Sequence, residues 1–431
     1  MKRLNTLVLG ALISTNAMAS IATDKNFDQQ IRAQGLVAKD QSYCFTNAAG
    51  KTEGTNVDMR IRLASVSKLL TSLWAVDKLG MEYKYDMKIT IKDNNLHIAG
   101  ALDPFLGNEK MFYLVSQLNA LGYTKFDTIT FDKNLIIDPD VAYESDEYPS
   151  MSNAMIAKHL RNYFNTATWS ADTKTEYATY RNMAAPGRFV KDISFEATNV
   201  KFVEENPFKD DADAKVLTLP SPALYKYLKE MNIKSNNTVA ESVFRQLGGL
   251  PAFKEYMSSR YSLTTDQIQF FTGSGLPATV NGERKDNYAT CAVMLDLLSN
   301  LKATVEKQGK ELEDLVAVPG SDGGTFRNRT FGSEYKNSFV AKTGTLMHTS
   351  TLAGAMNTQK GFSFFGVFNQ STDIGGSKVV QNSMVKSIMT EMGGPKAFDY
   401  EVPGFHAYTD ALKSFGDEED TNFSTIESGL N

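Results

Sequence analysis

One apolar helix near the N-terminus most constrains what this chain of 431 residues can fold into. From Leu63 to Gly80, apolar residues recur at helical spacing, and Gly80 fits the C-terminal stop of a helix. Ser65 opens the helix, and Lys68 lies one turn later on the same face. Because the helix is apolar, we expect Lys68 to lie near the protein interior, where desolvation lowers the pKa of a lysine. Ser65 and Lys68 are therefore a candidate nucleophile and base.

The Ser-x-x-Lys spacing is not specific by itself, because it recurs elsewhere in the chain. Further matches begin at Ser299, Ser333 and Ser383, and an exposed lysine on a helix or turn accounts for them. Ser65 differs from these serines because it opens a helix that we expect to be buried.

A second polar motif, Ser235-Asn236-Asn237, precedes a predicted helix at 238–247. Serine and asparagine both favour the N-cap of a helix, so capping is the simpler explanation. A loop at the start of a helix can also present Ser235 and Asn237 into a cleft, and the two roles are compatible.

A third motif, Lys342-Thr343-Gly344-Thr345, directly follows a predicted apolar strand at 338–341. Glycine at position 344 would let a substrate lie close to the backbone. An edge strand that carries a solubilising lysine is the simpler explanation of this motif alone.

The three motifs together are typical of penicillin-binding proteins and class A β-lactamases, in which they occur in this order. The segment between Lys68 and Ser235 is too long for a class A β-lactamase. The chain resembles the penicillin-binding protein 4 family of D-alanyl-D-alanine carboxypeptidases and endopeptidases. The resemblance extends over about residues 25–395 and is carried by five blocks in family order: 62–68, 100–104, 231–241, 272–276 and 318–329.

The resemblance implies an α+β fold, with an antiparallel sheet flanked by helices and a mainly helical lobe. This is the fold of penicillin-recognising serine transpeptidases and β-lactamases. The peptidase domain would be discontinuous, formed by residues 20–85 and 220–395. A smaller α/β domain would be inserted at 86–219, and an acidic C-terminal tail at 396–431 would be loosely ordered beyond about residue 405.

The resemblance also implies a serine acyl-enzyme mechanism. Ser65 would attack the carbonyl of the penultimate D-alanine, while Lys68 takes the proton of the hydroxyl. Ser235 would relay a proton to the leaving amine, positioned by Lys68 and Lys342.

Further site residues implied by the resemblance would bind the substrate. Asn237 would bond the substrate amide, and Lys342 and Thr343 the terminal carboxylate. The N–H groups of Ser65 and Thr345 would form the oxyanion hole. Gly344 completes the binding motif. No cofactor and no metal is expected, since the four histidines show no metal-ligand spacing.

Two positions depart from the family pattern. Asn236 replaces the aspartate that the family often has in the second motif. Pro277-Ala278 stands where the family often has an arginine, and Arg284 comes later in a longer loop. How the third residue of the stem peptide is recognised therefore stays open.

The first nineteen residues indicate export. Lys2 and Arg3 precede an apolar run, and Ala17-Met18-Ala19 is a small-residue cleavage site, so residues 1–19 are a predicted signal peptide. We expect a periplasmic or secreted protein without a stable membrane anchor. An exported chain could pair Cys44 with Cys291, but two buried thiols are an equal alternative.

The predicted partners are the stem peptides and cross-links of peptidoglycan, with β-lactam antibiotics as covalent inhibitors. A net charge of −5 argues against nucleic acid. The oligomeric state stays open.

The alternative functions are a β-lactamase and a catalytically silent wall-binding or penicillin-sensing protein. A Ser-His-Asp triad also stays open, although the chain has no Gly-x-Ser-x-Gly motif.

Overall fold

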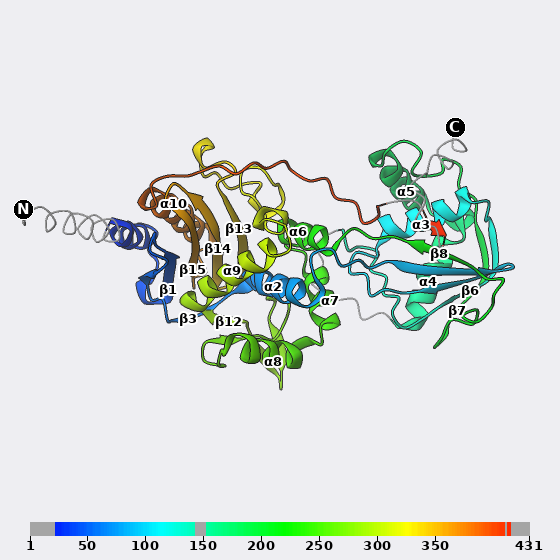
Figure 1. Cartoon of the computed structure of the whole chain (residues 1–431), viewed down its shortest axis with the longest axis horizontal. Helices are drawn as coiled ribbons and strands as arrows, with labels where there is room; N and C mark the ends of the chain where they lie inside the picture. Colours follow the sequence, from blue (N-terminus) through cyan, green and yellow to red (C-terminus); the bar gives the residue numbers. More distant parts are fainter. Residues whose placement is uncertain (1–21, 143–151, 410–411, 415–431) are drawn as a thin grey trace, which may run out of the picture. The chain divides into compact units, whose positions relative to one another are not determined.

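The computed structural model describes residues 22–142, 152–409 and 412–414 (Figure 1). The predicted signal peptide and the acidic run of the tail lie outside these residues. The chain forms two compact units, each built from two stretches of sequence. The first contains residues up to Met81 together with Leu228–Pro403, and the second contains Glu82–Tyr227 together with the residues from Gly404 onward.

The first unit is built on a five-stranded antiparallel sheet of order β13-β14-β15-β1-β2. Phe365 and Val367 of β15 pack on one face with helix α10 (Ile374–Glu391), while the alternate Gly366 faces α9 (Cys291–Glu306) on the other. Helices on both faces explain why the central strands are almost continuously buried. The strand bounds are β13 Phe339–Leu346, β14 Thr349–Thr358, β15 Gly361–Asn369, β1 Gln41–Thr46 and β2 Thr52–Thr55.

The helical part of the first unit contains the predicted helix with the Ser-x-x-Lys motif. The helix begins with a 3-10 turn, η2 (Ala64–Val66), and continues as α2 (Ser67–Leu79). Trp74 of α2 contacts the rings of Phe244, Phe253 and Tyr256. The apolar periodicity therefore predicted a buried helix correctly. The accompanying elements are α6 (Leu224–Lys234), α7 (Asn237–Gln246), α8 (Gly249–Tyr261), and the short strands β3 (Arg60–Arg62), β9 (Ile268–Gln269), β10 (Ala278–Val280), β11 (Glu283–Lys285) and β12 (Tyr288–Thr290).

The second unit is a mixed sheet of order β16-β8-β4-β5-β6-β7, in which β6 pairs in parallel with β5 and β7. The apolar side of the sheet packs against α3 (Asn108–Ala120), α4 (Asn153–Tyr163) and α5 (Ala171–Met183) in one core. An α/β unit was the sequence expectation for this stretch. The strand bounds are β4 Met87–Lys92, β5 Asn95–Ala99, β6 Lys125–Phe131, β7 Glu196–Phe202, β8 Lys215–Leu219 and β16 Lys413–Ser414.

The expectation of a loosely ordered tail beyond residue 405 is wrong for the part that the structure describes. The Tyr408 ring stacks on Tyr113 with 4.0 Å between centroids, and Leu412 is buried. Strand β16 then pairs antiparallel with β8. Acidic composition dominated the prediction, whereas a few apolar side chains decide where this segment packs.

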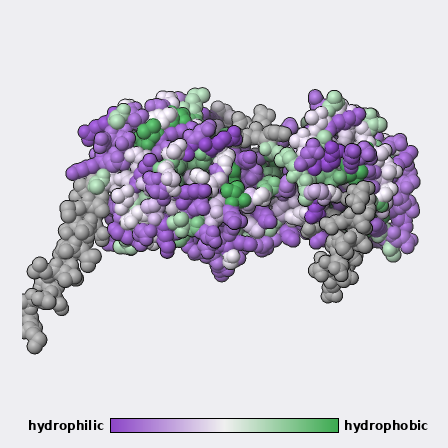
Figure 2. Space-filling view, turned by 90° about the horizontal axis from the view of Figure 1, so that it is seen from above, coloured by the Kyte–Doolittle hydropathy of each residue, from purple (hydrophilic) through white to green (hydrophobic). Residues whose placement is uncertain are grey.

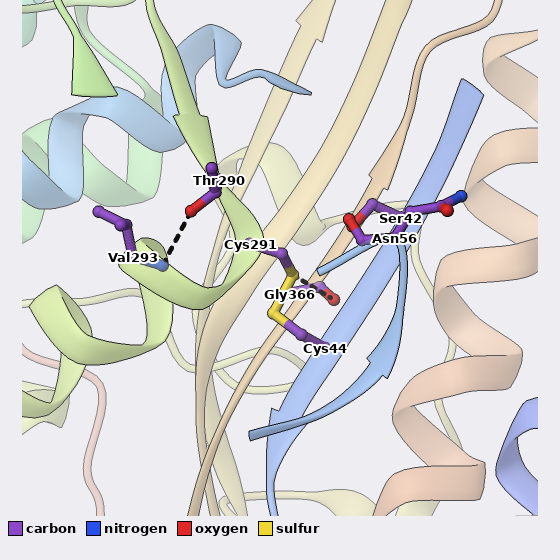
Figure 3. Close-up of a disulfide and its surroundings, with 7 residues drawn as sticks. All are labelled: Ser42, Cys44, Asn56, Thr290, Cys291, Val293 and Gly366. Carbon is purple, nitrogen blue, oxygen red and sulfur yellow. Dashed lines mark hydrogen bonds between the residues drawn. A yellow bond between two sulfur atoms is a disulfide. The ribbon is translucent and has the colours of Figure 1, made fainter. Parts of the chain in front are cut away.

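A disulfide joins Cys44, in the centre of β1, to Cys291, the first residue of α9 (Figure 3). The sequence left this pairing open. Thr290 caps the same helix, since its hydroxyl accepts a hydrogen bond from the Val293 N–H at 3.3 Å (Figure 3). The disulfide therefore anchors the start of α9 to the sheet.

Hydrophilic residues cover most of the face in Figure 2, and apolar residues occur there in small groups. Among the residues that the structure describes, no helix is long and apolar enough to cross a membrane.

Removing the disulfide should destabilise the first unit without changing its fold. The bond joins two residues that are 247 positions apart, and disulfides commonly contribute about 2–5 kcal/mol by restricting the unfolded chain. We expect the double variant Cys44→Ala/Cys291→Ala to unfold at lower urea concentration than the wild type. Reductant should shift the wild type toward the variant and leave the variant unchanged. A fully reduced wild type with an unshifted midpoint would contradict this expectation.

Candidate active site

Ser65 lies in the 3-10 turn that opens α2, and its side chain is half-buried. The turn is tightly constrained, since Ala64 has a φ of +49°, which is unusual for a residue with a Cβ. Both polar groups of the Leu63 backbone are bonded: the N–H donates to the Asn287 carbonyl at 3.0 Å, and the carbonyl accepts from Thr351 Oγ1 at 2.9 Å. The candidate nucleophile Ser65 thus lies in a turn whose backbone is bonded to two other segments. Residues 63–66 are called the nucleophile turn below.

Lys68 is fully buried and brings three segments together. Its Nζ donates to Ser65 Oγ at 3.1 Å, to Asn237 Oδ1 at 2.6 Å and to the Ser274 carbonyl at 2.8 Å. The first two contacts join residues that the sequence assigned to one site. An amine at hydrogen-bond distance from a hydroxyl has the geometry that a general base requires.

Ser235 lies between α6 and α7 in a left-handed backbone conformation, with φ +61°. Lys342 Nζ donates to Ser235 Oγ at 2.9 Å, and Lys342 itself is fully buried. The structure therefore joins the second motif to the third, as it joins Asn237 of the second motif to the first.

Asn236 explains why the middle of the second motif can differ from the family pattern. Its Oδ1 accepts a hydrogen bond from the Val239 N–H at 2.9 Å and caps α7. Asparagine and aspartate cap helices about equally well. The capping role thus belongs to Asn236, and the flanking Ser235 and Asn237 contact the two buried lysines.

The third motif lies on β13, at the edge of the sheet. The Ala341 N–H donates outward to the Ala317 carbonyl at 2.9 Å. Because N–H directions alternate along a strand, the Thr343 and Thr345 N–H groups point to the same outer edge. Thr343 is half-buried and Thr345 is exposed, so both lie where a ligand could reach them.

Gly344 makes a different close approach from the one expected from the sequence. A Cβ at this position would lie 2.3 Å from Thr351 Oγ1 and 2.7 Å from the Leu63 carbonyl oxygen. The backbone that requires glycine here is therefore the protein's own nucleophile turn, which packs directly on β13.

No role for the loop at 271–276 follows from the sequence, although residues 272–276 are one of the blocks that carry the family resemblance. Besides the Ser274 carbonyl that meets Lys68, Gly275 lies against the nucleophile turn. A Cβ on Gly275 would be 1.9 Å from the Ala64 carbonyl oxygen, and its φ is +85°. Because these contacts are made by the backbone, Gly275 is the residue whose type could have indicated them.

Arg284 lies on β11 and is bonded to Asp286, with 2.9 Å between Nη2 and Oδ1. Arg62 also pairs with Asp286 at 3.2 Å. The hydrogen bonds that Arg284 donates to the Asp286 carboxylate raise the pKa of its guanidinium. Arg284 is therefore held by the buried carboxylate of Asp286.

The block at 318–329 supports the fold around a buried lysine. Lys229 Nζ bonds Asp322 at 2.7 Å and the Val316 carbonyl at 2.8 Å. Burial lowers the pKa of Lys229, and the Asp322 carboxylate partly opposes this effect. Within residues 22–142, 152–409 and 412–414, no cluster of three or more His, Cys, Asp or Glu side chains could hold a metal ion.

Residues 197–390 match the model of the D-Ala-D-Ala carboxypeptidase 3 (S13) family. The match covers less than half of the chain and agrees with the predicted family. The chain is a serine-type D-Ala-D-Ala peptidase. A search of the curated protein sequences found no match.

Solved structures show the same fold over most of the chain. A predatory peptidoglycan endopeptidase from Bdellovibrio bacteriovorus, Bd3459, is 27% identical, with a TM-score of 0.80 over 87% of this chain and 98% of that one. A penicillin G-acylated form of Bd3459, in complex with immunity protein Bd3460, has a TM-score of 0.76, 27% identity, and coverage of 87% and 99%. Penicillin binding protein 4 from Haemophilus influenzae, 18% identical, has a TM-score of 0.55 over 84% and 97%. The α+β, penicillin-recognising fold is confirmed.

Gly344→Ala should disturb the peptidase because its Cβ would meet backbone of the nucleophile turn. We expect a lower melting temperature and a strongly reduced rate of labelling by fluorescent penicillin. Gly375→Ala is the matched control, since Gly375 is exposed in α10 and its added Cβ would make only an ordinary contact, 3.5 Å from Asp373 Oδ1. Equal labelling rates for the two variants would contradict this reading of Gly344.

Asn236→Asp should leave stability and labelling close to the wild type, because aspartate also caps a helix. Asn236→Ala should lower the free energy of unfolding by about 1 kcal/mol. Urea unfolding of both variants would check this pair, and an equal loss in both would argue against a capping role.

Proposed function

We propose that this peptidase acts on D-alanyl peptides of bacterial cell wall, as a DD-carboxypeptidase and DD-endopeptidase, through an acyl-enzyme on Ser65. The observation that carries the proposal is the buried Lys68 amine, which bonds both Ser65 Oγ and Asn237 Oδ1. The penicillin-acylated relative supports a covalent intermediate and inhibition by β-lactams.

Acylation begins with Ser65 Oγ, which attacks the carbonyl carbon of the penultimate D-alanine. Lys68 takes the hydroxyl proton over the 3.1 Å contact when its amine is neutral, because Nζ then accepts from Ser65 Oγ while it donates to Asn237 and to the Ser274 carbonyl. The oxyanion that forms is bound by the Ser65 and Thr345 N–H groups. One such donor contributes roughly 2.7–4 kcal/mol in a well-studied protease.

Departure of the amine requires a proton: Ser235 donates its hydroxyl proton to the amine and takes back the one that Lys68 removed from Ser65. Its hydroxyl is bonded to Lys342 Nζ at 2.9 Å. The leaving amine is free D-alanine in the carboxypeptidase reaction and the amine of a second stem peptide in cross-link cleavage. Lys342 and Thr343 bind the terminal carboxylate, and Asn237 bonds the substrate amide. Water then hydrolyses the Ser65 ester and restores the enzyme.

We also propose that the protein works in the periplasm or is secreted. The predicted signal peptide at 1–19 supports this, and so does the Cys44–Cys291 disulfide. Disulfides form and persist mainly in oxidising compartments.

A β-lactamase would need a carboxylate that activates water near the ester. Glu241 is an acidic residue bonded to the loop that meets Lys68: its Oε1 accepts from the Ser274 N–H at 2.8 Å. This contact gives Glu241 a part in holding the loop. We therefore expect Glu241→Gln, which keeps an acceptor oxygen, to release penicilloate as slowly as the wild type. A variant with a much longer acyl-enzyme lifetime would instead favour the β-lactamase.

Ser65→Ala should abolish covalent labelling by fluorescent penicillin and release of D-alanine from a pentapeptide. Ser299→Ala is the matched control, because Ser299 heads another Ser-x-x-Lys match and is exposed on α9. Labelling that persists in Ser65→Ala would show that the nucleophile is wrong. A wild type that labels but never releases D-alanine would favour the penicillin-sensing alternative.

Digestion of purified sacculi would measure the two activities separately. Separation of the muropeptides should show loss of terminal D-alanine and conversion of cross-linked dimers to monomers. Neither change should occur with Ser65→Ala. If the wild type releases terminal D-alanine but leaves the cross-linked muropeptide dimers unchanged, the proposed endopeptidase activity is wrong.

A further inference from the structure

Asn287 is a fully buried residue directly before β12, and the mechanism above gives it no role. Its Oδ1 accepts from the N–H groups of Phe271 and Thr272 at 2.8 and 3.3 Å. Its Nδ2 donates to Ser67 Oγ at 3.0 Å and to the Thr272 carbonyl at 2.7 Å. A carboxamide has two donor hydrogens and two acceptor lone pairs, so these contacts use its whole capacity.

These bonds join two segments that are far apart in the sequence. One is the nucleophile turn, which Asn287 reaches through Ser67 Oγ and through its own carbonyl, bonded to the Leu63 N–H at 3.0 Å. The other is the loop at 271–276, whose first two N–H groups it holds. The Asn287 side chain therefore links this loop directly to the start of α2.

That distance matters because the loop supplies an acceptor for Lys68. The Ser274 carbonyl lies 2.8 Å from Lys68 Nζ. Thr71 Oγ1 fixes the preceding carbonyl, of Gly273, at 2.7 Å, and Glu241 fixes the Ser274 N–H. Gly275 then touches the Ala64 backbone with no room for a Cβ.

We propose that Asn287 is a positioning residue for the proposed peptidase reaction. It holds the Ser274 carbonyl against Lys68 and thereby keeps Nζ in line with Ser65 Oγ. This inference rests on the roles proposed for Ser65 and Lys68.

Only an amide satisfies all the groups around this side chain. Aspartate would place a carboxylate oxygen near the Thr272 carbonyl and would lose both donors. Alanine would leave the Phe271 and Thr272 N–H groups without their acceptor in the interior, where an unmet donor is costly. Either change should move the loop, and small displacements of catalytic groups reduce rates steeply.

The test is acylation by fluorescent penicillin, with the binding constant and the acylation rate constant measured separately. Asn287→Asp and Asn287→Ala should lower the acylation rate constant by about tenfold or more, since misplacement of a catalytic group by about 1 Å costs up to about a hundredfold. The binding constant should change little, because Asn287 is buried and bonded only to protein groups in the contacts above.

Gln381→Ala is the control for loss of a buried amide. Gln381 is fully buried in the same unit, and its Nε2 donates to Ser350 at 3.1 Å and to Asn369 at 3.2 Å. Its variant should lower the melting temperature but leave the acylation rate constant unchanged. Acylation that is equally fast in the Asn287 variants and in Gln381→Ala would overturn the inference.

Thr71→Val keeps the test decisive if both Asn287 variants fail to fold. It removes the hydrogen bond to the Gly273 carbonyl of the same loop and should also slow acylation. An unchanged acylation rate constant would count against the inference.

Ser65→Ala separates the two proposals. Labelling of Ser65→Ala would overturn the proposed function, whereas normal acylation in the loop variants with a silent Ser65→Ala would overturn only the role of Asn287.

Discussion

The rest of the site depends on one buried amine. Lys68 has no exposed surface, and its Nζ is surrounded by Ser65, Asn237 and the Ser274 carbonyl. A lysine is costly to bury without partners. Elements that supply such partners, α7 and the loop at 271–276, must therefore meet at α2. The arrangement that makes burial tolerable is the same one that brings a base to the nucleophile.

A second buried amine organises the other side of the site. Lys342 on the edge strand β13 holds Ser235, while glycine at 344 lets the nucleophile turn lie against the same strand. Helices α10 and α9 pack on the two faces of the sheet, and the Cys44–Cys291 disulfide joins it to α9. Support of this kind is what positions reacting groups to within fractions of an ångström.

Much of the site was predictable because its parts are local patterns. The apolar periodicity of the helix at 63–80 predicted that Lys68 is buried, and the structure confirms it. The order of three motifs predicted which residues meet. Asn287, Glu241 and Thr71 were not predictable, because a polar residue that bonds backbone groups of a distant loop leaves no pattern of its own. The order of the tail was missed because composition describes an average, whereas Tyr408 and Leu412 pack individually.

The sequence by itself indicated the family, through five blocks in family order, and that resemblance implied the α+β fold. It also determined the set of polar side chains available for acyl transfer, which follows from motif order and residue chemistry. Only the tertiary structure decided that Cys44 pairs with Cys291, that Asn236 is the cap, and that Gly344 makes room for the nucleophile turn. It also decided which carbonyl meets Lys68. Each of these depends on the distance between residues far apart in the chain, and packing sets that distance.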